Sequence, residues 1–232
     1  MKGSDLVGDA EYLFHVTVFG NSYGFSRNII IQWVIIIAVA AVSIFLTRGL
    51  KKIPNKRQSV AELLVESAST VVKSNVGEEY LNLVPYVGTL VVFLLTMNLT
   101  GLVGFEPPTM DYSVALGMAL ISFFVIQGYT IKKLGLGHYF LGYAKPAAFL
   151  LPMNVLERFL LPVSLSLRLF GNMTAGATIM GIIYSSLAKV GWVAQLGIPV
   201  PLHMYFDLFD GGVQMVVFMM LTIINLKVIV EH

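Results

Sequence analysis

The chain has 232 residues, of which 56% are hydrophobic and only 12% are charged, and it contains no cysteine. Soluble domains carry about 25% charged residues, so this composition indicates an integral membrane protein. The formal net charge of +2 does not indicate a nucleic-acid partner, and the lack of cysteine excludes disulfides, thiolate metal ligands and a cysteine nucleophile.

The first long apolar segment runs from about Asn28 to Thr47, after an N-terminal stretch of 27 residues. A helix of about 20 apolar residues crosses the hydrocarbon core. The densest group of basic residues follows at once: Arg48, Lys51, Lys52, Lys56 and Arg57. Cytoplasmic loops are rich in Lys and Arg, so this loop is predicted to be cytoplasmic and residues 1–27 to lie outside.

An amphipathic helix is predicted from Ser59 to Val76. Apolar residues recur there at helical spacing, with charged residues between them: Val60, Leu63, Leu64, Val71 and Val72 against Glu62, Glu66 and Lys73. This pattern is typical of a helix that lies on the membrane surface, here the inner one.

Two further spans are predicted, at about Leu83–Val103 and about Tyr112–Ile131. The turn between them, Gly104-Phe105-Glu106-Pro107-Pro108, and the residues after it carry only the charges of Glu106 and Asp111, as expected of an outer loop. Lys132, Lys133 and Lys145 then mark an inner connection.

The last part of the chain is predicted to form a hairpin of two long helices. The first arm, Met153 to about Ala188, has 36 residues and would be about 54 Å long, whereas the hydrocarbon core is about 30 Å thick. This arm must therefore tilt, lie partly in the membrane plane or bend, and Pro162 marks the expected bend. After residues 191–201, the second arm runs from Leu202 to about Val230 and ends inside.

The predicted fold class is therefore an all-α integral membrane protein, with about five membrane helices plus the inner-surface amphipathic helix. We find no internal repeat, so residues 1–232 form one membrane domain. Within it, residues 1–27 form the outer segment, residues 28–151 the peripheral helices and residues 152–232 the hairpin.

Polar side chains follow one face of each hairpin arm. On the first arm Glu157, Leu161, Ser164, Arg168 and Asn172 are spaced by four, three, four and four residues, and on the second His203, Asp207, Asp210 and Gln214 are spaced by four, three and four. Ionisable groups within a membrane usually line a water-filled path or meet a partner.

Arg168 is the most informative of these residues. A guanidinium stays charged in proteins, and an arginine near mid-bilayer costs roughly 2.5–3.5 kcal/mol on the insertion scale. We therefore expect Arg168 to act against a charge that is supplied from elsewhere. The alternative is a structural salt bridge with an acidic residue of the other arm.

The other polar residues also have simpler interpretations. Asn172, Ser164 and Gln214 are also compatible with plain interhelical hydrogen bonds. His203 and Asp207 are also compatible with a solvated place near the membrane surface. Glu157, beside Arg158, is compatible with a local surface pair.

Metal-dependent and hydrolytic functions find little support. His203 and Asp207 have ligand spacing on a helix, and Phe209-Asp210-Gly211 resembles the Asp-Gly element of intramembrane site-2 metalloproteases. That chemistry needs a His-Glu-x-x-His helix, which the four histidines (His15, His138, His203 and His232) never form. No Gly-x-x-x-x-Gly-Lys-Ser/Thr loop is present either, so we expect no cofactor, no metal and no catalysis by this chain alone.

Two motifs resemble a known family. Ser166-Leu167-Arg168-Leu169-Phe170-Gly171-Asn172-Met173-x-Ala175-Gly176 resembles the signature of subunit a of F-type ATP synthases, and Gln214-x-x-x-Phe218-x-x-Leu221-Thr222 resembles the last helix of that family. The resemblance covers the whole chain in length, hydropathy and hairpin order. It implies a stator subunit in a bacterial plasma membrane, packed against the ring of c subunits and joined by subunit b of the peripheral stalk.

The resemblance also implies roles for single residues. Arg168 takes the place of the essential arginine, Asn172 that of the nearby asparagine and Gln214 that of the last-helix glutamine, while Glu157 resembles an acidic residue that precedes the arginine. Many members carry glutamate where this chain has Ala177, and some carry histidine where it has Asp207. We therefore expect Asp207 to supply the relay carboxylate, supported by His203 and Asp210.

The function so predicted is ion transfer between two aqueous half-channels and the carboxylates of the ring, with H⁺ and Na⁺ both open. The alternative is a self-contained transporter or channel with Arg168 as substrate anchor. Secondary transporters often contain internal repeats, which this chain lacks.

Overall fold

The computed structural model describes residues 12–18, 21–137, 139, 151–189, 197 and 199–231. Some predicted features lie outside the described residues, namely the basic connection at Lys145, most of the turn at 191–201, and His138 and His232.

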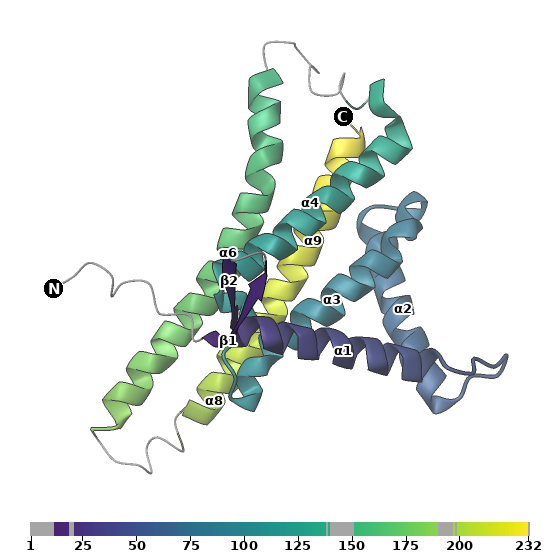
Figure 1. Ribbon diagram of the computed structural model, residues 1–232. Coiled ribbons are helices and arrows are strands. Elements are labelled where there is room, and N and C mark those ends of the chain that lie inside the picture. Colours follow the sequence, from purple (N-terminus) through teal and green to yellow (C-terminus); the bar gives the residue numbers. More distant parts are fainter. Residues whose placement is uncertain are drawn as a thin grey trace.

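The described chain is mainly helical (Figure 1). Its helices are α1 (Arg27–Thr47), α2 (Lys56–Asn75), α3 (Val84–Asn98), α4 (Tyr112–Leu134), α6 (Leu151–Leu187), α8 (Pro199–His203) and α9 (Gly211–Glu231). Short 3-10 turns η1 (Glu78–Leu83), η2 (Leu99–Val103) and η3 (Pro108–Met110) flank α3 and α4, and a π-helix, η5 (Met204–Asp210), joins α8 to α9. The predicted all-α membrane class is confirmed, and the predicted elements lie within a few residues of their expected bounds.

A small hairpin precedes α1 and was not predicted. Strands β1 (Tyr12–Val18) and β2 (Asn21–Ser26) pair antiparallel, from Tyr12 opposite Ser26 to Val18 opposite Asn21. It lies within the segment that the sequence predicts to be outside.

Four helical segments of the described chain are long and apolar enough to cross a membrane: Asn28–Thr47, Glu78–Val103, Tyr112–Leu134 and Pro199–Glu231. The fifth predicted membrane helix, α6, has 37 residues, but Arg168, Asn172 and its many small residues make it less apolar than the other four. The chain is thus a multi-pass membrane protein. Of its five predicted membrane helices, the least apolar one, α6, carries Arg168.

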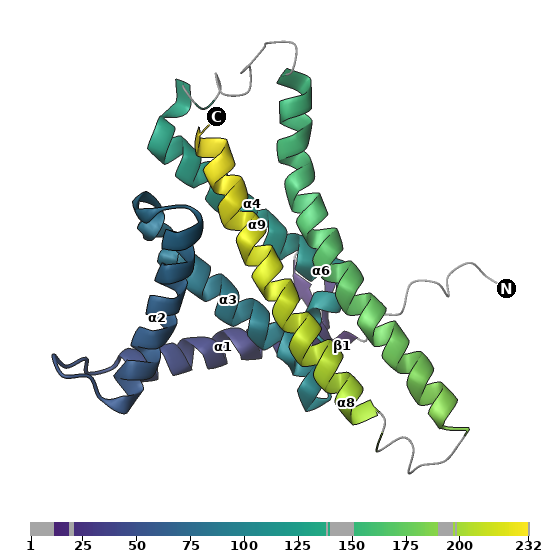
Figure 2. The same cartoon turned by 180° about the vertical axis from the view of Figure 1, so that it is seen from behind.

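Helix α6 remains continuous through Pro162. The helix changes direction along its length, as both opposite views show (Figures 1 and 2). Helix α6 is therefore curved without a break, and the place of Pro162 as the centre of the bend stays a prediction. Proline removes one backbone hydrogen bond of a helix, which permits such a change of direction without ending the helix.

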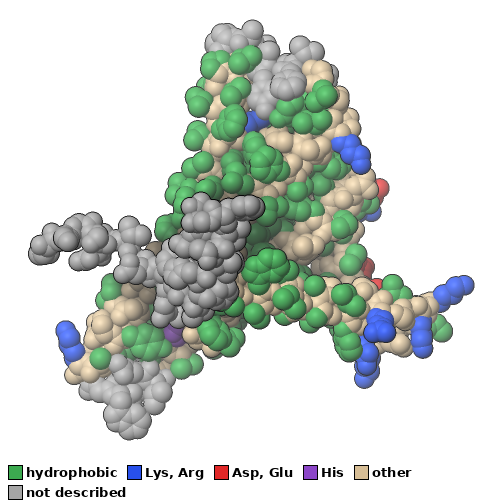
Figure 3. Space-filling model, viewed as in Figure 1, with side chains coloured by type: hydrophobic (Ala, Val, Ile, Leu, Met, Phe, Trp, Pro, Cys, Tyr) green, Lys and Arg blue, Asp and Glu red, His purple; other side chains and the backbone are tan. Residues whose placement is uncertain are grey.

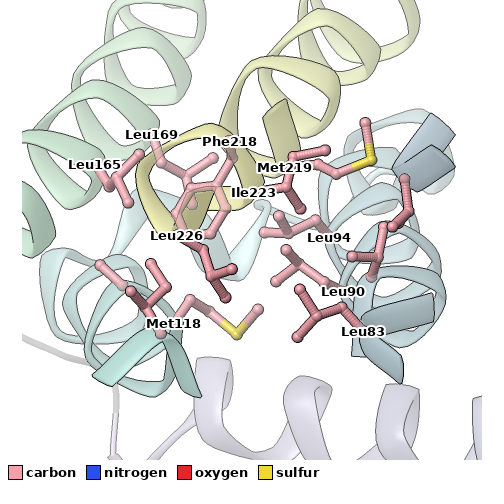
Figure 4. Close-up of a cluster of buried hydrophobic side chains, with 14 of the residues drawn as sticks. Leu83, Leu90, Leu94, Met118, Leu165, Leu169, Phe218, Met219, Ile223 and Leu226 are labelled. Atoms are coloured by element: carbon pink, nitrogen blue, oxygen red, sulfur yellow. The ribbon is translucent and has the colours of Figure 1, made fainter. Parts of the chain in front are cut away.

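The core lies where α3, α4, α6 and α9 meet (Figure 4). Leu90 and Leu94 of α3 and Met118 of α4 pack there with Leu165 and Leu169 of α6 and with Phe218, Ile223 and Leu226 of α9. Because Leu165, Leu169 and Met173 turn one face of α6 inward, Ser164 and Arg168 are exposed on its other side. Core packing thus decides which face of α6 remains free.

Candidate ion-translocation site

The start of α9 is fixed by a buried asparagine. The side-chain amide of Asn98, at the end of α3, donates a hydrogen bond of 2.9 Å to the backbone carbonyl of Gly211. Thr109 donates to the other end of the same amide at 3.1 Å. An ideal Cβ on Gly211 would lie only 3.0 Å from the Cβ of Asn98, so glycine permits the close approach. These contacts fix the position of the π-helix that ends at Asp210.

The π-helix carries Asp207 toward the end of α3. Its carboxyl group lies directly over Gly101 of η2, so that a Cβ at residue 101 would lie 2.8 Å from Cγ of Asp207. The side chain of Asp207 is only 13% exposed. The absence of a side chain at Gly101 therefore creates the space that the carboxylate occupies.

Asp207 belongs to a chain of hydrogen-bonding groups. One of its oxygens lies 2.8 Å from Nδ1 of His203, and Nε2 of the same ring lies 3.1 Å from the hydroxyl of Tyr184. Tyr184 comes from α6, whereas His203 and Asp207 come from the second arm of the hairpin. Because both imidazole nitrogens have a polar partner, this series of hydrogen-bonding groups is able to pass a proton between the tyrosine hydroxyl and the carboxylate.

These groups line a pocket of about 360 Å³ between the two arms and the turn after α3. Its polar lining residues are Glu106, Asn172, Tyr184, His203, Asp207 and Asp210. Four of the predicted site residues, Asn172, His203, Asp207 and Asp210, are therefore brought together. Sequence reasoning placed Glu106 only in an outer loop and did not single out Tyr184, which follows the lining residue Met173 by eleven residues and therefore lies on the same side of α6.

Small residues of the first arm let the second arm approach. An ideal Cβ on Gly176 would lie 3.3 Å from a ring carbon of Phe206. The glycine in the Ala175-Gly176 pair thus gives the π-helix room to pack on α6. Ala177, the next residue, lines the pocket together with Asp207.

Arg168 lies outside this pocket. Its side chain is exposed and forms no hydrogen bond or ion pair with any residue that the structure describes. The alternative of an internal salt bridge thus finds no acidic partner within the described chain. The guanidinium is left available to a group from outside the subunit.

The remaining predicted residues lie apart from the pocket as well. Ser164 shares the exposed side of α6 with Arg168. Glu157 is exposed and forms no ion pair with a described residue, so the local pair with Arg158 is not formed. Gln214 is 7% exposed, and its amide makes no hydrogen bond within the described part of α9 or its neighbours.

The described residues include no group of three or more His, Asp or Glu side chains that is arranged to hold a metal ion. His203 and Asp207 are bonded to each other rather than directed to a common centre. The pocket is thus suited to proton or ion exchange through carboxylate, imidazole and hydroxyl groups.

Comparison with known proteins identifies the family of this chain. The family model described as "ATP synthase A chain" matches residues 29–227. A protein of Moorella thermoacetica named ATP synthase subunit a is 35% identical, over 84% of this chain and 87% of that protein. A protein of a Bradyrhizobium species named ATP synthase subunit a 2 is 32% identical, over 95% and 93%. A protein of Propionigenium modestum named ATP synthase subunit a, sodium ion specific, is 28% identical, over 94% and 79%.

The family match covers every element that builds the site, from α1 to most of α9. The relatives are matched over most of their own length as well as most of this chain. The membrane helices and the polar hairpin of this chain fit a part of a larger ion-transporting assembly. The chain belongs to the ATP synthase A chain family and has the role of an ATP synthase subunit a.

Proposed function

We propose that this chain is the ion-translocating stator subunit in the membrane sector of a rotary F-type ATP synthase. In this proposal Arg168 and the pocket around Asp207 transfer H⁺ or Na⁺ to and from carboxylates on a rotating ring of c subunits. The observation that carries the proposal is the exposed Arg168, which pairs with no residue that the structure describes and lies on a mostly apolar helix.

Because Arg168 is charged as well as exposed, it can act on a carboxyl group of the ring. An ion-loaded, neutral carboxyl group of the ring releases its ion when it faces a fixed cation. Two unit charges about 4 Å apart, at an effective dielectric near 20, attract by roughly 4 kcal/mol. Arg168 also repels cations that would leak directly between the two aqueous half-channels, so that ions must travel with the ring.

The pocket around Asp207 is proposed as the inner end of the half-channel on the outer side. It includes Glu106 and the turn after α3, which the sequence places outside. An ion enters past Glu106, and for a proton the chain of Tyr184, His203 and Asp207 provides the transfer groups. Asp210 and Asn172 complete the polar lining.

The two departures from the family pattern have one explanation in this proposal. Ala177 stands where many members carry glutamate, and it lines the same pocket as Asp207. A carboxylate on either arm would therefore enter the same space. We infer that Asp207 supplies from the second arm the charge that other members supply from the first.

The other predicted residues have proposed supporting roles. Ser164 flanks Arg168 on the exposed side of α6, and Glu157 lies near the start of that helix. Gln214, on the second arm, offers an amide that pairs with no described residue. Residues 1–232 act as one membrane domain, with residues 28–151 supporting the hairpin of residues 152–232. Subunit b of the peripheral stalk is the further partner that the family implies.

The proposed location is a bacterial plasma membrane, with the N-terminus outside and the C-terminus in the cytoplasm. The basic turn after α1 supports this orientation, because Lys and Arg are more frequent in cytoplasmic loops.

The proposal is tested with the complete ATP synthase reconstituted in liposomes. Arg168→Ala should abolish coupled ATP synthesis while the complex still assembles, because the residue is exposed and packs on no core. Thr178→Ala, a change at another exposed residue of α6, should leave synthesis unchanged. Normal synthesis with Arg168→Ala contradicts the mechanism, and ion transport by the purified chain alone favours the self-contained transporter.

A further inference from the structure

A basic pocket lies at the turn between α1 and α2, which is distant in sequence from the helical hairpin of residues 152–232. It has a volume of about 400 Å³, and its charged lining residues are Arg48, Lys56 and Arg57. Lys51 and Lys52 belong to the same turn but do not line it. Figure 3 shows basic side chains gathered between the end of α1 and the start of α2, at the lower right. The proposed ion path uses none of them.

The positive charge of the pocket is not neutralised within the described chain. Arg48, Lys56 and Arg57 form no ion pair with a described residue. The first acidic residue after α1 is Glu62, and its carboxylate already accepts a hydrogen bond from Gln58. The three exposed cations are therefore free to meet an anion from another molecule.

The turn is held in shape by its own contacts. The amide of Gln58 accepts a hydrogen bond from the backbone N–H of Lys51 and donates one to its carbonyl, both at 2.9 Å. The guanidinium carbon of Arg57 lies 4.5 Å from the ring centroid of Phe45, which joins α2 to the end of α1. The turn and the Arg57 guanidinium are therefore held in place before any anion binds.

The surroundings of the pocket are apolar and exposed. Only 6% of the apolar window of α1 is buried inside the chain, and Ile53, at the tip of the turn, is 84% exposed. In α2, the C-terminal half packs on the core through Val72, whereas Val60, Leu63 and Leu64 of the N-terminal half remain exposed. The exposed apolar surfaces of α1 and α2 are suited to acyl chains. The pocket lies next to them, because α1 ends at Thr47, directly before Arg48.

We infer that this pocket binds the phosphate headgroup of an anionic phospholipid, with the lipid's acyl chains against α1 and the exposed half of α2. Three cations at the end of an apolar span match a phosphate that is attached to a hydrocarbon tail. An arginine fork suits phosphate oxygens, because it offers two parallel hydrogen bonds. A bound lipid would anchor the α1–α2 turn to the membrane surface and steady the helices that support the hairpin.

The experiment measures lipid binding to the full chain in detergent by native mass spectrometry, with phosphatidylglycerol as the anionic probe and phosphatidylcholine as the zwitterionic control. The variant Arg48→Gln/Arg57→Gln removes two pocket cations. The matched control Lys51→Gln/Lys52→Gln removes two cations of the same turn that do not line the pocket. Circular dichroism confirms that both variants keep the helix content of the parent chain.

The proposal expects phosphatidylglycerol to bind at least about tenfold more tightly than phosphatidylcholine, since each basic residue near a surface attracts anionic lipid. Arg48→Gln/Arg57→Gln should lose roughly tenfold or more of this affinity, and the control should lose less than about threefold. Gln58→Ala keeps every cation and should still weaken binding several-fold, because the turn loses its internal contacts.

Three results would overturn the proposal. Equal losses in the two double variants would mean that general attraction, not the pocket, binds the lipid. Displacement of the lipid by millimolar inorganic phosphate would mean that the site takes the free anion. Unchanged lipid binding, with loss of another subunit from the purified complex of the pocket variant, would assign the pocket to a protein partner.

Discussion

The carboxyl group of Asp207 occupies the space where residue 101 would carry a side chain. An ideal Cβ on Gly101 would lie 2.8 Å from both Cγ and Oδ1 of Asp207. Interiors are close-packed, so a methyl group at this position would have to move the π-helix or turn the carboxylate away from His203. A glycine on the second membrane segment thus determines where an acidic residue of the last one lies.

Gly101→Ala should therefore impair ion transfer without removing any polar group. We expect ATP-driven ion pumping to fall about tenfold or more, because a displacement of about 1 Å can cost a factor of 100. Gly128→Ala, where an added Cβ would meet nothing within 4 Å, is the matched control and should pump normally. Unimpaired pumping with Gly101→Ala would show that the position of the carboxylate does not matter.

Asp207→Asn keeps the size of the side chain and removes its charge. Proton flux through the reconstituted complex should slow by about tenfold or more, because positioned proton-transfer groups contribute about 100-fold or more in other sites. The pH profile of the flux should change with it. An unchanged rate and pH profile would remove Asp207 from the path.

His203 and Asp207 should act as a unit, since their side chains are 2.8 Å apart. In a double-mutant cycle, His203→Gln and Asp207→Asn should together slow proton flux by much less than the product of the two single effects. Tyr184→Phe removes only the hydroxyl at the far end of the chain and should have a smaller effect than His203→Gln. Strictly multiplicative effects would mean that the two residues work independently.

A carboxylate on the first arm should replace one on the second. In the background of Asp207→Ala, the substitution Ala177→Glu should restore part of the lost proton flux, because both positions line one pocket. Thr178→Glu places the same charge one residue further on the exposed side of α6 and should restore nothing. No rescue by Ala177→Glu would contradict a shared role for the two positions.

The buried contact between α3 and α9 should matter for stability. Asn98→Leu leaves the carbonyl of Gly211 without its donor, at a cost of about 1–3 kcal/mol, and the thermal midpoint of the purified complex should fall. Thr96→Val loses only a hydrogen bond within its own helix and should change the midpoint little. Equal midpoints for Asn98→Leu and the parent would mean that the contact adds no stability.

Much of the architecture was predictable from the sequence, for a physical reason. Long apolar segments must be helices in a bilayer, since every backbone group must be satisfied within the segment. The spans at Asn28–Thr47 and Tyr112–Leu134, and the surface helix after the basic turn, therefore follow from hydropathy and charge alone. The hairpin β1–β2 was not predicted, because strands of seven and six residues form a much shorter pattern than a membrane span of about 20 residues.

The site was predictable in part. The four-residue step from His203 to Asp207 already indicated that the two side chains are neighbours, because local helical geometry decides it. Contacts between residues of separate helices could not be predicted from such spacing. No pattern within α6 or η2 reveals that Tyr184 reaches His203, or that Gly101 makes room for Asp207.

The sequence by itself determined that Arg168 is unusual, because a permanent charge in a membrane helix costs free energy whatever the fold. Only the tertiary structure decided that this charge is exposed and has no partner among the described residues. The packing of Leu165 and Leu169 into the core turns the opposite face of α6 outward, and the acidic residues of the second arm gather in a pocket that Arg168 does not line. Side-chain periodicity is a property of one helix, whereas the choice of which face is covered depends on all the helices that pack against it.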